Sequence, residues 1–264
     1  MFPNLVIFGR EISYYTILAL IGILAFGFYA CKKIKDKGHN DVDMIILLLI
    51  SSVGVVIGAQ LLYGITNTRY IVDLFKNIDK FDSFWEFIKL LIPAFRGSVF
   101  YGGLIGGLVV GCIYIKKRKL NFNDFSDVCA TGIPLFHTFG RIGCFVGSCC
   151  FGIESHFGIV YHHSPINIAN DVIRFPVQLL EASLNFTLFL VLNHMLNKGK
   201  LRGKLIYVYL IAYAVIRFFD EFLRGDTYRG FIFGLSTSQF ISVILFICAV
   251  VALYIQKKKA RAKI

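Results

Sequence analysis

Residues 140–152 combine one arginine, three cysteines and four glycines at the end of an apolar stretch. An arginine in such surroundings is costly unless an anionic group uses it. Glycines at the same place let the backbone approach a ligand closely, because they carry no side chain. These residue types indicate a site for an anionic headgroup at a membrane surface, with Arg141 as its cation and Gly140, Gly143 and Gly152 beside it.

The thiols of this segment, Cys144, Cys149 and Cys150, allow three interpretations. They could bind a metal ion together with His137, one or two helical turns earlier, although C-x4-C-C is not a standard zinc spacing. They could exchange thiols and disulfides at an oxidising membrane face, with a thiolate near Arg141. They could also be small side chains that pack the turn. The other four cysteines stand singly in apolar stretches and are expected to be packing residues: Cys31, Cys112, Cys129 and Cys248.

A second polar pattern ends another apolar stretch, where Tyr213, Arg217, Glu221 and Arg224 follow at intervals of four, four and three residues. On a helix, this spacing places all of them on one face. One interpretation is a structural ion pair between Arg217 and Glu221. The other is a pair of guanidinium groups that hold a phosphate, with Glu221 orienting one of them. Arginine suits this task because its planar fork binds two phosphate oxygens at once.

Further polar residues and glycines stand where other helices are expected to begin. Gly102 and Gly103 belong to a glycine-rich stretch, 102–107, that is typical of tight helix packing. Tyr101, directly before it, is expected either to hydrogen-bond a headgroup or to be an interfacial aromatic residue. Gln178 and Glu181 lie within one turn of each other at the start of a later helix, and Glu181 is expected near the outer surface. Three histidines in the preceding loop are expected to be exposed rather than ligands: His156, His162 and His163.

The elements that must position these residues are apolar. The chain has 264 residues, of which 56% are hydrophobic and only 17% are charged, with a mean hydropathy of +0.68. This composition predicts an all-α membrane protein with a single polytopic domain, residues 1–264. A short aromatic stretch, 84–95, predicts a helix that lies in the interface. About 20 mostly apolar residues cross the hydrocarbon, and seven stretches qualify: 12–30, 44–65, 99–115, 125–144, 177–196, 205–223 and 236–255.

Charge predicts the orientation of these helices. Lysine and arginine concentrate after the first, third, fifth and seventh apolar stretches. Because cytoplasmic loops are enriched in these residues, the N-terminus is expected outside and the C-terminus in the cytoplasm. The net charge of +12 then reflects topology and anionic lipid, so we expect no nucleic-acid partner. The first apolar stretch shows no evident signal-peptide cleavage site. The polar residues above, with Tyr15 near the start of the first helix, converge on the outer leaflet.

In this order, the motifs resemble those of the prolipoprotein diacylglyceryl transferase family over nearly the whole chain. Residues 140–152 are similar to the family's Gly-Arg-x-Gly-Asn-Phe-x-Asn-x-Glu-x-x-Gly signature, with Gly140, Arg141, Gly143, Phe145 and Gly152 in place. Residues 101–104 resemble its His-Gly-Gly-Leu motif, and residues 176–181 match its Pro-x-Gln-Leu-x-Glu run. The pattern from Tyr213 to Arg224 matches its sixth helix, and residues 234–239 are similar to its ending.

The resemblance implies a reaction at the outer leaflet of the bacterial inner membrane. The diacylglyceryl group of phosphatidylglycerol passes to the lipobox cysteine thiol in the signal peptide of a preprolipoprotein; a thioether forms and glycerol-1-phosphate leaves. The resemblance implies no metal or cofactor, and we expect a monomer that contacts membrane lipid. The expected catalytic residues are Arg141, Arg217, Tyr101 and Glu221. The expected substrate-binding residues are Tyr15, Gly102, Gly103, Gly140, Gly143, Cys144, Gly152, Gln178, Tyr213 and Arg224.

The chain also departs from the family pattern. Tyr101 stands where the family has the histidine proposed as base for the acceptor thiol, and tyrosine is a poor base near pH 7. Cys144 and Gly147 replace the signature asparagines, Cys149 replaces its acidic residue, and Gln60 stands where the family tends to have arginine. Two alternatives therefore stay open: the same fold acting on a different acceptor, or a membrane thiol-redox or sulfur-anion carrier protein that uses the cysteine cluster.

Overall fold

The structure is a computed structural model that describes residues 4–7, 10–77, 81, 83–95, 97, 99–225, 231–232 and 234–261. The chain divides into two compact units, which are described one at a time. The first comprises Met1–Lys37 together with Asn123–Ile264, and the second comprises Gly38–Phe122. Arg96 and Ser98, at the expected start of the third apolar helix, lie outside the described residues.

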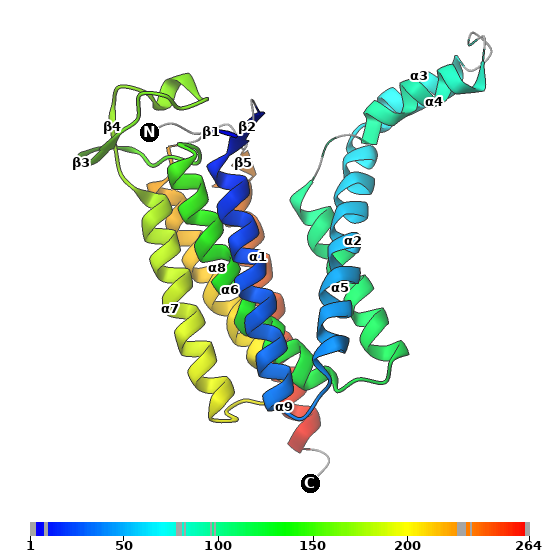
Figure 1. The fold of residues 1–264 in the computed structure, drawn as a ribbon, viewed down its shortest axis with the longest axis vertical. Coiled ribbons are helices and arrows are strands. Elements are labelled where there is room, and N and C mark those ends of the chain that lie inside the picture. Colours follow the sequence, from blue (N-terminus) through cyan, green and yellow to red (C-terminus); the bar gives the residue numbers. More distant parts are fainter. Residues whose placement is uncertain are drawn as a thin grey trace. The chain divides into compact units, whose positions relative to one another are not determined.

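Five long helices form the first unit (Figure 1). They are α1 (Tyr14–Asp36), α6 (Phe122–Val146), α7 (Val177–Asn197), α8 (Leu205–Asp220) and α9 (Thr237–Arg261). Helices α1 and α6 approach closely, since a Cβ atom at Gly132 would collide with the ring of Phe26. Helix α8 packs against both α7 and α9. The side chain of Ser13 caps the start of α1 by accepting a hydrogen bond from the amide of Tyr15, at 3.2 Å.

Within the residues that the structure describes, four helical segments are long and apolar enough to cross a membrane: Tyr14–Asp36, Asp41–Ile65, Val177–Asn197 and Thr237–Lys258. Most of their surface is apolar and not covered by the rest of the described chain, so hydrocarbon is the solvent that suits it. The chain is therefore a helical membrane protein, as its composition predicts. Helices α6 and α8 are less clear-cut by themselves, because α6 carries charged residues and α8 has only 16 residues.

The charged residues at the start of α6 connect this helix to the loop before α8. Asp127 is 1% exposed and accepts hydrogen bonds from the amides of Gly203, at 2.5 Å, and Leu205, at 3.0 Å. Asp124 is similarly buried and receives the guanidinium of Arg202 at 2.7 Å. Asp127 thus satisfies backbone donors at the start of α8, which explains an aspartate in an otherwise apolar helix.

Three small antiparallel hairpins were not expected from the sequence. They pair β1 (Asn4–Ile7) with β2 (Arg10–Ser13), β3 (Glu154–Val160) with β4 (Ile173–Arg174), and β5 (Phe231–Ile232) with β6 (Leu235–Ser236). The labelled strands gather at one end of the helices of the first unit, opposite the chain's C-terminus (Figure 1). A small core of Phe151, Tyr161 and Ala169 lies under the β3–β4 hairpin.

The second unit contains α2 (Asp41–Thr66), α3 (Thr68–Lys76), α4 (Phe84–Leu91), the 3₁₀ helix η2 (Ile92–Phe95) and α5 (Phe100–Lys117). Helices α2 and α5 pack backbone to backbone, since a Cβ atom at Gly58 would collide with the carbonyl oxygen of Gly102. Gly103 of α5 likewise faces the side chain of Val55 on α2. These contacts confirm the tight packing predicted for the glycine-rich stretch. Helix α4 with η2 fills the predicted interfacial segment, whereas α3 was not predicted.

Candidate anion site beside a three-thiol cluster

Two arginines of the first unit share one carboxylate. Glu181, in the second turn of α7, is 2% exposed. Its side chain forms an ion pair with Arg141 of α6 and accepts a hydrogen bond from Nη1 of Arg224 at 3.1 Å. The side chain of Arg224 is 2% exposed, whereas that of Arg141 is 22% exposed. Arg141 is thus the member of this group that can reach a ligand from outside.

Arg217, near the end of α8, forms a second ion pair. Its Nη2 atom lies 2.5 Å from Oε2 of Glu221, in the 3₁₀ turn Glu221–Leu223 that follows the helix. The same Nη2 donates a hydrogen bond to Oγ of Ser238 on α9, at 2.9 Å. The Nη1 atom of Arg217 is buried and has no hydrogen-bond partner among the described residues. A buried guanidinium with an unused donor is unusual unless a further acceptor binds there.

Asp220 lies within electrostatic range of both ion pairs. It is 3% exposed and interacts electrostatically with Glu181 and with the three arginines: Arg141, Arg217 and Arg224. Arg141 and Arg217, from different helices, therefore both act electrostatically on Asp220; that they face a common site stays a prediction. The cluster contains three guanidinium and three carboxyl groups, and the carboxylates hold the guanidinium groups in place. An anion that enters it meets preformed, desolvated donors.

A tight turn after α6 brings the cysteines to this cluster. Ser148 and Cys150 have positive φ angles of 53° and 55°, which is uncommon for residues other than glycine. The turn is fixed by hydrogen bonds at both ends of Cys149. Its amide donates to the carbonyl of Cys144 at 3.0 Å, and its carbonyl accepts from Nε2 of Gln178 at 2.8 Å. Gln178 is fully buried and also contacts the hydroxyl of Tyr161, so it holds the turn rather than facing an open site.

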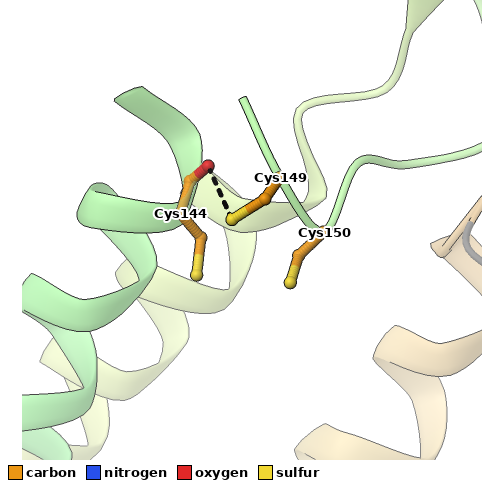
Figure 2. Close-up of side chains that lie close together, drawn as sticks. All are labelled: Cys144, Cys149 and Cys150. Atoms are coloured by element: carbon orange, nitrogen blue, oxygen red, sulfur yellow. Dashed lines mark hydrogen bonds between the residues drawn. The ribbon is translucent and has the colours of Figure 1, made fainter. Parts of the chain in front are cut away.

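The three thiols lie together inside this turn. The Sγ atoms of Cys144, Cys149 and Cys150 are all within 4.8 Å of one another, and none forms a disulfide (Figure 2). The Sγ of Cys149 points back to the carbonyl of Cys144, at 3.6 Å (Figure 2). Hydrogen bonds from Cys144 and Cys149, together with the charge of Arg224, lower the pKa of the Cys150 thiol. Three soft sulfur atoms thus adjoin the arginines.

Tyr15 lies against the same turn. Its Cα atom is 3.3 Å from the position that a Cβ atom at Gly143 would occupy, so α1 and α6 meet closely there. The hydroxyl interacts electrostatically with Cys144 and Arg141. Because Tyr15 is 45% exposed, its ring is available to a ligand at the edge of the cluster.

Other expected site residues have different surroundings. A Cβ atom at Gly152 would collide with the carbonyl of Phe175, and Gly152 pairs with Arg224 as an isolated β-bridge, so this glycine allows two backbones to cross. Gly140 has open space at its Cβ position. The ring of Tyr213 lies 5.4 Å from that of His137, inside the bundle.

Tyr101, Gly102 and Gly103 belong to the second unit and are described within it alone. Tyr101 lies in the first turn of α5, and Gly102 and Gly103 contact α2. The expected exposure of the loop histidines is confirmed for all three: His156, His162 and His163.

The expectation that Arg224 continues the face of the sixth apolar helix is wrong. Helix α8 ends at Asp220, a 3₁₀ turn follows, and Arg224 is extended, with φ −88° and ψ 136°. This change of direction turns the arginine toward Glu181 on α7. Glu181 and Asp220 are the members of the cluster that the sequence analysis did not assign. An acid in the first turns of an apolar helix, and a second acid beside Glu221, were the available signals.

The first unit thus has the fold of a polytopic membrane protein with a buried arginine cluster at one end of its helices. A family model described as "Prolipoprotein diacylglyceryl transferase" matches residues 3–255. The chain belongs to the prolipoprotein diacylglyceryl transferase family. This agrees with the resemblance drawn from its motifs.

Relatives of similar length bear the family's name. Phosphatidylglycerol--prolipoprotein diacylglyceryl transferase 2 of Clostridium perfringens is 32% identical over 97% of this chain and 95% of its own length. The transferase of Clostridium tetani is 31% identical over 92% of this chain and 93% of its own length. That of Campylobacter hominis is 33% identical over 91% of this chain and 85% of its own length.

Proposed function

We propose that this protein transfers the diacylglyceryl group of phosphatidylglycerol to the lipobox cysteine of a preprolipoprotein. The names of its relatives support the donor, the acceptor and the type of reaction. The observation that carries the proposal to particular residues is the buried, unused Nη1 donor of Arg217 in a cluster with Arg141. A lipid phosphate supplies the oxygen atoms that such a donor lacks.

The chemistry asks the protein to stabilise a leaving phosphate. The acceptor sulfur attacks the glyceryl carbon, a C–S bond forms, and the bond from that carbon to the phosphate oxygen breaks. The electron pair stays on the departing glycerol-1-phosphate, whose negative charge grows as the bond breaks. Arg141 and Arg217 are the cations for this charge, and Glu221 and Glu181 hold their guanidinium groups in place.

We propose that this chemistry takes place at the outer leaflet. The seven helices α1, α2, α5, α6, α7, α8 and α9 each cross the bacterial inner membrane once. The N-terminus is outside and the C-terminus in the cytoplasm, because basic residues lie in and after the last turns of α1, α5, α7 and α9. The two units together form one domain that acts as a monomer. Tyr15, Gly140 and Gly143 line the headgroup site.

A transfer assay tests the proposal. Purified protein in phosphatidylglycerol micelles receives a lipobox peptide, and the thioether product is measured by mass. Arg217→Ala is expected to lower kcat by about 10²- to 10³-fold, as loss of one donor to a developing anion does. Arg217→Lys should restore little, because an ammonium group does not replace the planar fork. Arg118→Ala is the control, since that side chain is 58% exposed at the end of α5.

Two results would count against the proposal. The first is full activity in both Arg141→Ala and Arg217→Ala. The second is no thioether product from the wild-type protein with any lipobox peptide, together with failure to rescue a strain that lacks its own transferase. The second result would favour a different acceptor on the same fold.

A further inference from the structure

The thiol cluster has a geometry that neither packing nor a single disulfide requires. Three sulfur atoms meet within 4.8 Å, although two of them come from adjacent residues. Adjacent side chains ordinarily diverge, and the positive φ angles of Ser148 and Cys150 belong to the turn that gathers them. A disulfide would use two of these sulfur atoms and leave the third alone. Three converging sulfur atoms are a suitable ligand set for a thiophilic metal ion.

The dimensions fit such an ion. A zinc–sulfur bond is about 2.3 Å long, which puts the sulfur atoms of a tetrahedral centre roughly 3.8 Å apart. The observed limit of 4.8 Å therefore requires each thiol to move by less than about 1 Å. Rotation of the side chains supplies this movement while the backbone stays fixed. Gln178 holds the carbonyl of Cys149 at 2.8 Å, and Oγ of Ser164 donates to the carbonyl of Ser148 at 2.6 Å.

The cluster also offers three ligands and not four. Within the described part of the chain, no histidine, aspartate or glutamate joins the three cysteines in this group. Structural zinc sites use four protein ligands, whereas catalytic ones use three and keep the fourth position for a reactant. Three thiolates on a divalent cation leave a net charge of −1, and Arg141 and Arg224 stand beside them to balance it.

We propose that Cys144, Cys149 and Cys150 bind a thiophilic divalent cation such as Zn²⁺, whose open fourth position takes the acceptor cysteine as a thiolate. This inference rests on the proposed function for the identity of the acceptor. It departs from the expectation, drawn from the family resemblance, that no metal takes part. It also supplies what Tyr101 lacks, since a thiol bound to such a metal is deprotonated by coordination without a basic side chain.

The step balances without a redox partner. The acceptor thiol binds the cation and its proton leaves to water. The metal-bound sulfur then attacks the glyceryl carbon of phosphatidylglycerol, and the C–O bond to phosphate breaks with its electron pair on the phosphate oxygen. The product is a thioether, which is neutral and a weaker ligand than a thiolate, so it leaves the cation. Water or the next acceptor thiol then takes the fourth position.

Metal binding is tested on the whole protein, purified without oxygen in a phosphine reductant. Zn²⁺ content is measured after dialysis, and Co²⁺ is the spectroscopic probe because thiolate ligands give it intense charge-transfer bands. We expect about one Zn²⁺ per chain and sulfur–cobalt bands in the wild-type protein. Cys149→Ser and Cys150→Ser should each lose more affinity than the roughly 10- to 100-fold that loss of a second-shell partner costs. Cys248→Ser, an exposed thiol of α9, is the matched control and should bind as the wild type does.

The open position is tested with a lipobox peptide and with the same peptide carrying serine in place of cysteine. The cysteine peptide should add intensity to the sulfur–cobalt bands of the Co²⁺ protein, and the serine peptide should not. Absence of bound metal under reducing conditions would overturn the proposal. Bands that persist in the triple serine variant, or that do not respond to the cysteine peptide, would overturn it as well.

These readouts separate the metal site from the proposed function. If a metal-free wild-type protein produces the thioether at an unchanged rate, the proposed transferase activity is supported and the proposed metal site is refuted. If the protein binds one metal ion whose bands respond to the cysteine peptide but forms no product from phosphatidylglycerol, the metal site is supported. The assignment of phosphatidylglycerol as the donor is then refuted. Since metal binding is read without turnover, a variant that is merely inactive does not mimic either result.

Discussion

Replacement of Glu181 by alanine leaves two guanidinium groups without their common acid. The side chain of Arg141 is 22% exposed, so water can replace part of the stabilisation that its ion pair with Glu181 provided. Arg224, with 2% of its side chain exposed, keeps a buried charge and loses the hydrogen bond at 3.1 Å. Removal of one partner of a buried ion pair costs about 3–5 kcal/mol, which we expect for Glu181→Ala. Glu181→Gln keeps an oxygen acceptor and should cost about 1.5–3 kcal/mol, the value of a charge-assisted hydrogen bond.

The free energy of unfolding is measured by reversible denaturant titration of the protein in mixed micelles, with helix content as the signal. Glu154→Ala is the matched control, because its carboxylate is 71% exposed and lies 3.8 Å from Arg174; an exposed pair of this kind contributes about 0–1 kcal/mol. If Glu181→Ala costs no more than Glu154→Ala, Glu181 does not neutralise the arginines and the described cluster does not exist in the protein. If Glu181→Gln lowers the free energy of unfolding as much as Glu181→Ala does, the hydrogen bond that glutamine can still accept contributes nothing, and this part of the reasoning is wrong.

Two further substitutions test the packing around the site. Gly102→Ala puts a methyl group against the backbone of α2 and is expected to lower the melting temperature in detergent, whereas Gly27→Ala meets nothing within 4 Å and should not. Gln178→Leu removes the donor to the Cys149 carbonyl and should weaken Zn²⁺ binding by about 10- to 100-fold, with helix content unchanged. Equal melting temperatures of the two glycine variants, or unaltered Zn²⁺ affinity in Gln178→Leu, would refute these expectations.

Hydrophobicity made the membrane-spanning class of the fold predictable. Apolar runs such as 44–65 and 236–255 are predicted to be helical from their sequence alone. A segment that crosses hydrocarbon must satisfy its backbone hydrogen bonds within itself, and a helix does so. The short hairpins escaped prediction because strands of two to seven residues, such as β4 and β3, have too little pattern of their own. Their pairing depends on distant chain segments, as in the bridge between Gly152 and Arg224.

Site residues that share one helix could be predicted from the sequence. Residues that come together only because the backbone changes direction could not. Arg141, Arg217 and Glu221 could be chosen from residue type and helical spacing. Glu181 could not, because its partners come from α6 and from beyond the end of α8. The proximity of the three thiols also depends on backbone angles at Ser148 and Cys150 that no spacing rule contains.

Three of the departures of this chain from its family, at Tyr101, Cys144 and Cys149, have one physical explanation if the thiols bind a metal. A tyrosine in place of the histidine removes the usual proton acceptor for the attacking thiol. Cysteines in place of asparagine and an acid replace oxygen atoms by soft sulfur, and soft sulfur favours a cation that can deprotonate a thiol directly. Arg141 interacts electrostatically with both Cys144 and Glu181, so the proposed metal site and the proposed phosphate site would share one guanidinium group. The attacking sulfur and the leaving phosphate would then both lie near this arginine, and displacement requires them on opposite sides of the glyceryl carbon.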